Sequence, residues 1–301
     1  MKKALGYILL IFCFCVFSVQ VFGQGISKEK IKADGETYRY YSTQPQGKVS
    51  GIVILLPALG EKPQSIFDKT VIPKLLGEKG YLTIVPELHN LLFADQYTIT
   101  EIDQIIATLS QKYAGSAFVI GGLSSGGAIA VAYTEFILAS GTHNVLKGVF
   151  AIDSPLDLSR IYASAERKIN YNCGGLIMKE GYSIKSELDR ALGGPPDARP
   201  EQYLKYSCFS TLAADGGNAK LLKNIAVRLY CEPDLDFVRN TYCTDLQFAD
   251  INASDLEGLD HFLSKAGNSN AEYITTKGKG FHTWNIIEPN DFVDWVMKIN
   301  K

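Results

Sequence analysis

The sequence predicts an α/β domain in which a mostly parallel central sheet is flanked by helices and carries a cap-like insertion. Short apolar runs rich in β-branched residues alternate with longer helix-like segments, the pattern of a parallel sheet with crossover helices. A glycine-rich turn at 122–127 joins one such run to an alanine-rich segment. The interval 155–224 breaks the alternation with several glycines and prolines. So long an interruption inside an α/β domain is commonly a cap over a functional site.

The N-terminal segment predicts export. Lys2 and Lys3 precede a continuous apolar run over 8–22, and this order of charge and apolar residues is typical of a signal peptide. The run is shorter than the ~20 residues that span a bilayer. We therefore expect a signal peptide at 1–23, cleaved between Gly23 and Gln24, no stable membrane span after processing, and a secreted or periplasmic protein. The alternative is that the run is not cleaved and remains as an anchor.

Processing leaves about 280 residues, enough for one α/β domain over 24–301 that includes the insertion at 155–224. The formal net charge of −2 supplies no electrostatic reason to expect nucleic acid or an anionic membrane as a partner. Four cysteines remain, which either two disulfides or four buried thiols would explain: Cys173, Cys208, Cys231 and Cys243. No Cys-x-x-Cys or Cys/His cluster in the sequence suggests a metal.

The elements can be placed by their apolar pattern. The clearest strands are 51–56, 81–85, 118–121, 149–152 and 226–230, with a last strand at 272–276. Helices are expected over 67–78, 100–112, 125–140, 255–266 and 290–299. Within 155–224 we expect only short helical stretches.

The turn after the third of these strands carries a candidate nucleophile. It reads Gly122-Leu123-Ser124-Ser125-Gly126 and leads into the alanine-rich helix. This is a Gly-x-Ser-x-Gly nucleophile elbow in its strand–turn–helix context. The sharp turn crowds the residues two before and two after the serine, which are both glycine. The sequence therefore predicts Ser124 as a nucleophile.

A serine hydroxyl needs a base to remove its proton, so a histidine is expected on a loop after the last strand. The chain has four histidines. His143 and His261 fall in a helix-ending loop and a predicted helix, where surface positions explain them. His282 follows the last strand and precedes the final helix, which is where the base is expected. His89, after the second predicted strand, is an outside candidate for lining a substrate pocket.

The third member of such a triad is a carboxylate on a loop after an intervening strand. Asp234 follows the strand 226–230 and is the predicted acid, with its neighbour Asp236 two residues on. Asp153 is the rival, because it directly ends the strand before the insertion. For the oxyanion hole, the backbone N–H of Ser125 and an N–H from the loop after the first strand are expected, with Leu59 as the preferred donor.

These residues resemble the α/β-hydrolase superfamily, whose members carry Ser, acid and His in the order Ser124, Asp234, His282. The resemblance covers about 49–296. The segment Leu192-Gly193-Gly194-Pro195-Pro196 with the following 200–207 is similar to one in esterases and prolyl-oligopeptidase-type peptidases. The chain departs from the family at Pro57-Ala58, where His-Gly is usual, and at Cys231-Glu232, near a usual glycine.

The resemblance implies an exported serine hydrolase that cleaves a carboxylic ester or related acyl bond through a Ser124 acyl-enzyme. It implies a small-molecule ester or acyl substrate, with no organic cofactor and no catalytic metal. Two alternatives remain open. One is a peptidase of the same fold, and the other is a non-catalytic binding protein that keeps the fold.

Overall fold

The computed structural model describes residues 25–33, 35–89, 91–142 and 145–300. The expected signal peptide at 1–23, with its cleavage site, and His143 lie outside the described residues. Within those ranges, no helix combines the length and the apolar character that crossing a membrane requires.

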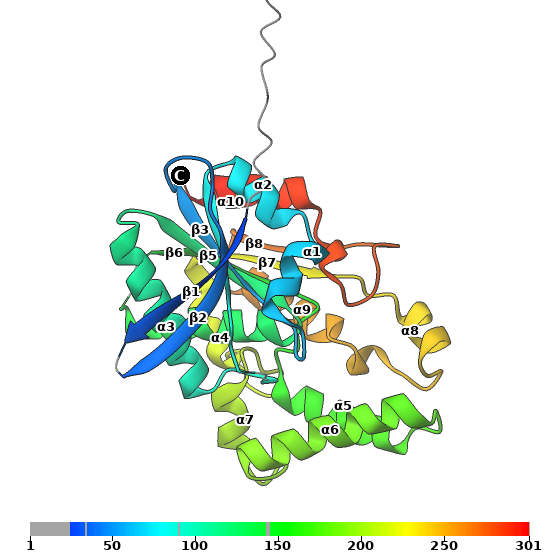
Figure 1. Ribbon diagram of the computed structural model, residues 1–301. Coiled ribbons are helices and arrows are strands. Elements are labelled where there is room, and N and C mark those ends of the chain that lie inside the picture. Colours follow the sequence, from blue (N-terminus) through cyan, green and yellow to red (C-terminus); the bar gives the residue numbers. More distant parts are fainter. Residues whose placement is uncertain (1–24, 34, 90, 143–144, 301) are drawn as a thin grey trace, which may run out of the picture.

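An eight-stranded sheet forms the centre of the described chain, in the order β1-β2-β4-β3-β5-β6-β7-β8 (Figure 1). Its strands are β1 (Ile26–Ala33), β2 (Glu36–Thr43), β3 (Gly51–Leu56), β4 (Tyr81–Pro86), β5 (Ala117–Leu123), β6 (Leu146–Ile152), β7 (Ala226–Cys231) and β8 (Ala271–Thr275). β1 and β2 form an antiparallel hairpin, and β2 joins β4 antiparallel. All other pairs are parallel. The mostly parallel sheet expected from the sequence is therefore confirmed.

The N-terminal hairpin was not expected. β1 is an edge strand, and every second position from 28 to 32 is an exposed lysine: Lys28, Lys30 and Lys32. Lysines on an edge discourage pairing with a further strand. They also remove the apolar run by which the inner strands were recognised.

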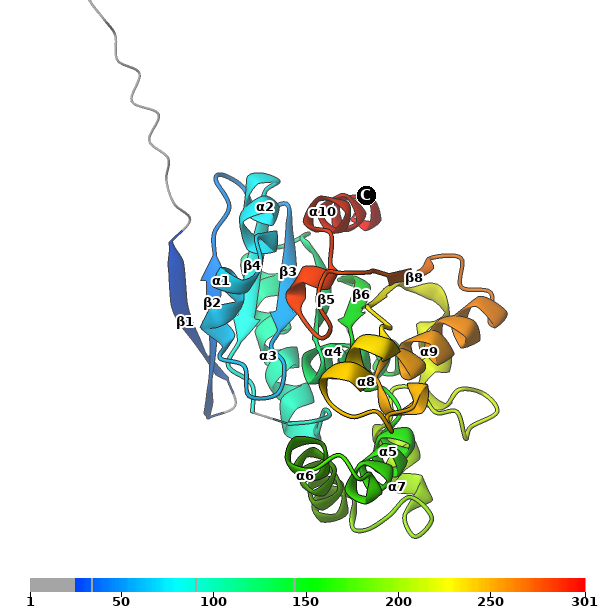
Figure 2. The same cartoon turned by 90° about the vertical axis from the view of Figure 1, so that its right-hand side faces the viewer.

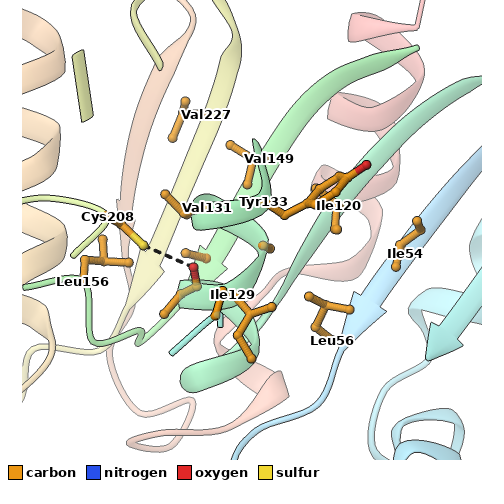
Figure 3. Close-up of a cluster of buried hydrophobic side chains, with 14 of the residues drawn as sticks. Ile54, Leu56, Ile120, Ile129, Val131, Tyr133, Val149, Leu156, Cys208 and Val227 are labelled. Carbon is orange, nitrogen blue, oxygen red and sulfur yellow. Dashed lines mark hydrogen bonds between the residues drawn. The ribbon is translucent and has the colours of Figure 1, made fainter. Parts of the chain in front are cut away.

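Two helical layers cover the sheet, and β3 shows how its residues are divided between them. Ile54 and Leu56 belong to the core under α3 (Gln96–Lys112), α4 (Ser125–Ser140) and α9 (Ala253–Lys265). Val53 and Leu55 face α2 (Ile72–Glu78) and α10 (Pro289–Ile299) on the other side (Figure 2). Side chains of successive strand residues point to opposite faces, so an all-apolar strand must be covered on both. Figure 3 shows the first of these cores, where Ile129 of α4 packs among the strand side chains.

The covering helices are α1 (Ile66–Lys69), α2 (Ile72–Glu78), α3 (Gln96–Lys112), α4 (Ser125–Ser140), α9 (Ala253–Lys265) and α10 (Pro289–Ile299). The single helix expected over 67–78 is divided. Thr70 is extended, with φ −144°, and Pro73 lies in the first turn of α2. Proline has no N–H to bond back to a preceding turn, so it begins a helix more readily than it continues one.

The segment between β6 and β7 is more helical than expected. It holds α5 (Leu158–Asn170), α6 (Gly175–Leu192), α7 (Pro200–Tyr206) and η2 (Gly217–Asn224). α5, α6 and α7 lie together at one end of the molecule (Figure 1). They share a small core that includes Tyr162, Leu188 and Tyr203. The insertion therefore has a small core of its own, and other residues of it, such as Ile177, join the core on one face of the sheet.

The four cysteines form one disulfide and leave two free thiols, which is neither the two disulfides nor the four buried thiols expected. Cys173, between α5 and α6, is disulfide-bonded to Cys243, which follows α8 (Leu235–Thr241). Cys208 and Cys231 are buried free thiols. The Cys208 Sγ donates to the backbone oxygen of Ala128 at 3.2 Å, the contact drawn as a dashed line in Figure 3.

Candidate active site

Ser124 occupies a sharp turn between β5 and α4. Its backbone has φ 57° and ψ −126°, and its N–H donates to the Ile152 oxygen at 2.8 Å. A Cβ on Gly122 or Gly126 would press against the backbone oxygen of Leu56. The two glycines are therefore required by the close approach of the end of β3. The turn has the geometry that presents a serine at the carboxyl end of a parallel sheet.

Positive φ angles mark the same place. In the described part of the chain, the non-glycine residues with positive φ are Ser124, Asp153 (φ 41°) and His282 (φ 61°). This conformation is unfavourable for residues with a Cβ and persists where the surroundings enforce it, often at functional sites. The three residues are separated by up to 158 positions in sequence and belong to three different loops, yet all share this conformation.

Asp153 and His282 form a close pair. Asp153 Oδ2 lies 2.5 Å from His282 Nδ1. The carboxyl side chain is 2% exposed and the imidazole 36%. Asp153 directly follows β6 as Ser124 directly follows β5, and these strands are parallel neighbours that pair Leu123 with Ile152. The serine and the carboxylate thus emerge side by side, and the loop after β8 brings the histidine to the carboxylate.

The expectation that Asp234 would accept the imidazole hydrogen bond is wrong. Asp234 caps α8, and its Oδ1 accepts the Phe237 N–H at 2.8 Å. Asp236 is exposed in the first turn of the same helix. The chain enters α8 so soon after β7 that the Asp234 carboxylate satisfies a helix terminus instead. The partner of His282 is the rival residue, Asp153.

A different carboxylate after β7 supports the histidine loop. Glu232 is 6% exposed. It accepts the Lys279 N–H at 2.7 Å, the Gly280 N–H at 3.3 Å and the Thr276 hydroxyl at 3.0 Å. In the sequence, Glu232 stands out only as a departure from the family pattern. A glutamate directly following a mostly apolar strand is the signal that could have identified it.

The surroundings of His282 act on its pKa in opposite directions. Burial lowers the pKa of the imidazole. The hydrogen bond to Asp153 and the negative charge of Asp153 raise this pKa, and Glu180 and Glu61 raise it by smaller amounts. The net pKa is raised above 6.5. Because Nδ1 faces Asp153, Nε2 is the nitrogen available to exchange a proton with another group.

The loop after β3 presents backbone N–H groups near the start of α4. The Ala58 N–H donates to Glu61 Oε2 at 2.9 Å, and the Glu61 N–H donates to the Ala58 oxygen at 2.9 Å. The Ala58 donor is thereby used. Leu59 lies within this turn and is 43% exposed, and Ser125 begins α4. Leu59 and Ser125 line one cavity of about 290 Å³.

Two cavities adjoin the candidate site. The first, next to Ser125, is also lined by Leu88 and His89. The second, of about 240 Å³, is lined by Asp153 and His282 together with Lys168 and Ile177 of the insertion. The insertion therefore contributes side chains beside the Asp153–His282 pair.

His261, which the sequence placed in a helix, lies exposed on α9.

Across the described ranges, one group of side chains has the donor types and spacing of a metal site: Cys173, Cys243 and Asp245. The two sulfurs are bonded to each other. A disulfide sulfur is not a thiolate, so this group does not fit the usual zinc ligand set.

No family model and no curated protein sequence matches this chain. Solved structures do. An esterase from Rhizomucor miehei has a TM-score of 0.60 and 16% identity, covering 92% of this chain and 84% of that one. A thermostable esterase from Pseudomonas putida has a TM-score of 0.57 and 14% identity, and the match covers 92% of this chain and 80% of that one. An acylaminoacyl peptidase from Pyrococcus horikoshii has a TM-score of 0.57 and 13% identity, and the match covers 89% of this chain and 39% of that one.

These similarities, together with the mostly parallel sheet and its flanking helices, define the class of the molecule by its fold. The chain has the α/β-hydrolase fold.

Proposed function

We propose that this protein is an exported serine hydrolase that cleaves a carboxylic ester or related acyl bond. Ser124 is the nucleophile, His282 the general base and acid, and Asp153 the carboxylate that orients the imidazole. The observation that carries the proposal is the contact of 2.5 Å between His282 Nδ1 and Asp153 Oδ2, with Asp153 at the strand end next to that of Ser124.

The first half of the reaction forms an acyl-enzyme. Ser124 Oγ attacks the carbonyl carbon while its proton passes to His282 Nε2. The negative charge on the carbonyl oxygen is met by the backbone N–H groups of Ser125 and Leu59, the proposed oxyanion donors. The bond to the alcohol oxygen then breaks, and His282 returns the proton to the departing alcohol.

The second half consumes water. His282 takes a proton from a water molecule, whose oxygen attacks the acyl carbon. The bond to Ser124 Oγ breaks, the serine recovers its proton from His282, and a carboxylic acid leaves. Asp153 keeps Nδ1 protonated throughout and stabilises the imidazolium in each half.

Three considerations favour an enzyme over a binding protein with the same fold. A binding protein has no need of a buried carboxylate against a histidine, or of positive φ at both of them. The cavities adjoining Ser125 and His282 offer room for the two sides of an ester. The esterases among the structural neighbours share the fold.

A fluorophosphonate, which reacts with activated serines, tests the mechanism. Wild-type protein should be labelled at Ser124 and hydrolyse simple esters. Ser124→Ala should lose the label and about 10⁶ in kcat. Labelling at another serine, or full activity of the alanine variant, would contradict the proposal.

A panel of esters with increasing acyl length and a matched panel of peptide amides tests the substrate class. Esters should give the higher kcat/KM, because an alcohol leaves more readily than an amine. The acylaminoacyl peptidase among the structural neighbours makes the amide panel a necessary comparison. Higher values on amides would identify a peptidase.

A further inference from the structure

Glu61 is a buried carboxylate that contacts both loops of the proposed catalytic site. Its side chain is 4% exposed. Oε2 accepts the Ala58 N–H at 2.9 Å, and both oxygens lie close to Trp284 Nε1, at 3.2 Å and 3.3 Å. Lys69 Nζ lies 2.7 Å from Oε1. Residues 223 positions apart are thereby joined through one side chain.

Toward the loop after β3, Glu61 closes a turn. Its N–H donates to the Ala58 oxygen and its side chain accepts the Ala58 N–H, so the segment from Ala58 to Glu61 is held at both ends. Gly60 has φ +77°, which lets the turn close. With the Ala58 donor engaged, the next N–H along the turn, that of Leu59, remains for an oxyanion.

Toward the histidine loop, Glu61 fixes a tryptophan two residues beyond His282. The Trp284 indole is 3% exposed and packs in the core under α2 and α10. Glu232 holds the same loop on the other side of His282, at Lys279 and Gly280. The histidine thus sits between two anchored points, of which only the Trp284 anchor is shared with the oxyanion loop.

We propose that Glu61 is a positioning residue that sets the oxyanion loop and the histidine loop relative to each other. The inference rests on the proposed function, because it assigns Glu61 an effect on that reaction. Glu61 touches no reacting atom. Its effect comes from holding the Leu59 N–H and His282 in place around one carbonyl group.

The charge of Glu61 supplies an independent readout. The groups around His282 that raise its pKa are Asp153, Glu180 and Glu61, opposed by burial. Lys168 and Asp250 line the cavity beside it. Removing the Glu61 charge should therefore lower the pKa of His282 and move the acid limb of the kcat/KM profile to lower pH.

Four variants separate positioning from general destabilisation. Glu61→Ala removes every side-chain contact, Glu61→Gln keeps the size with one acceptor oxygen and no charge, and Trp284→Phe removes the indole donor. Lys69→Met is the matched control, since Lys69 is half exposed and touches Glu61 from the outside. Each is assayed with one simple ester for kcat, KM and the pH dependence of kcat/KM, alongside thermal unfolding.

Glu61→Ala should lose on the order of 10² in kcat, with KM changed by less than about threefold. Glu61→Gln should lose less, and its acid limb should still move to lower pH. Trp284→Phe should lose kcat without moving the limb, because no charge is removed. Lys69→Met should keep the wild-type kcat at pH values above the acid limb.

Wild-type kcat in folded Glu61→Ala or Glu61→Gln would overturn the proposal, and so would an acid limb unmoved in Glu61→Gln. If Glu61→Ala fails to fold, Glu61→Gln and Trp284→Phe still decide the question. Failure of the proposed function looks different. In that case the wild-type protein itself shows no Ser124 labelling and no ester hydrolysis.

Discussion

At the scale of single residues, the site depends on which carboxylate meets His282. Asp153, Asp234 and Glu232 all follow strands at the same edge of the sheet. One accepts from imidazole, one caps a helix and one holds a loop backbone. A carboxylate's role here is determined by the donor that lies closest to it, since each buried donor requires an acceptor.

Asparagine substitutions test this assignment. Asp153→Asn keeps the size of the side chain but favours the wrong imidazole tautomer, a change that cost about 10⁴ in kcat in a serine protease. A loss of that order is expected here. Asp234→Asn should keep near-normal kcat, because asparagine also caps helices well. Steady-state kinetics on one ester compares the two, and the reverse ranking would return the assignment to Asp234.

The pH dependence follows from the raised pKa of His282. Protonated imidazole cannot accept the serine proton, so kcat/KM should fall as the pH drops through that pKa. Because the pKa is raised, the fall should begin above the ordinary imidazole value of 6.5. Asp153→Asn removes the negative charge that mainly offsets the effect of burial, so the pKa of His282 should decrease.

NMR titration of the imidazole C–H protons measures this shift directly, even in a variant of low activity. An unchanged or increased His282 pKa in Asp153→Asn would contradict the pairing.

At the scale of elements, the disulfide ties the insertion to the segment after α8. Cys173 and Cys243 are 70 positions apart in sequence. Residues on both sides of the bridge, among them Ile177 and Tyr242, line the cavity beside His282. The bridge therefore restrains the segments that form this cavity.

Replacing both cysteines by serine should lower the free energy of unfolding by roughly 2–4 kcal/mol, because a long loop in the unfolded chain is no longer closed. Urea unfolding measures the loss. Reductant should produce a similar loss in the wild-type protein and none in the double variant. A double variant as stable as the oxidised wild type would show that the bridge adds no stability.

At the scale of the whole molecule, we expect the chain to act outside the cytoplasm. The lysine pair and short apolar run at the N-terminus predict export, and the disulfide is of the kind that persists in oxidising compartments. Intact-mass measurement of protein recovered from its native compartment should give a chain beginning near Gln24. Retention of residues 1–23 in exported protein would indicate an anchor.

The parallel sheet, most of the helices over it and the turn around Ser124 could be predicted from the sequence. These depend on apolar periodicity and on glycines that only a crowded turn requires, and both are readable within a few neighbouring residues. The same reasoning located His282 on the loop before the last helix. The edge hairpin was missed because its strands lack a continuous apolar run.

The carboxylate that meets His282, the single disulfide and the contacts of Glu61 come from tertiary packing. Asp153 meets His282 across 129 positions, and Glu61 meets Trp284 across 223. Several carboxylates follow strands in this chain, and in sequence they have similar neighbours. Which of them reaches a given donor depends on the order of strands in the sheet and on where each loop turns, and these are properties of the packed molecule.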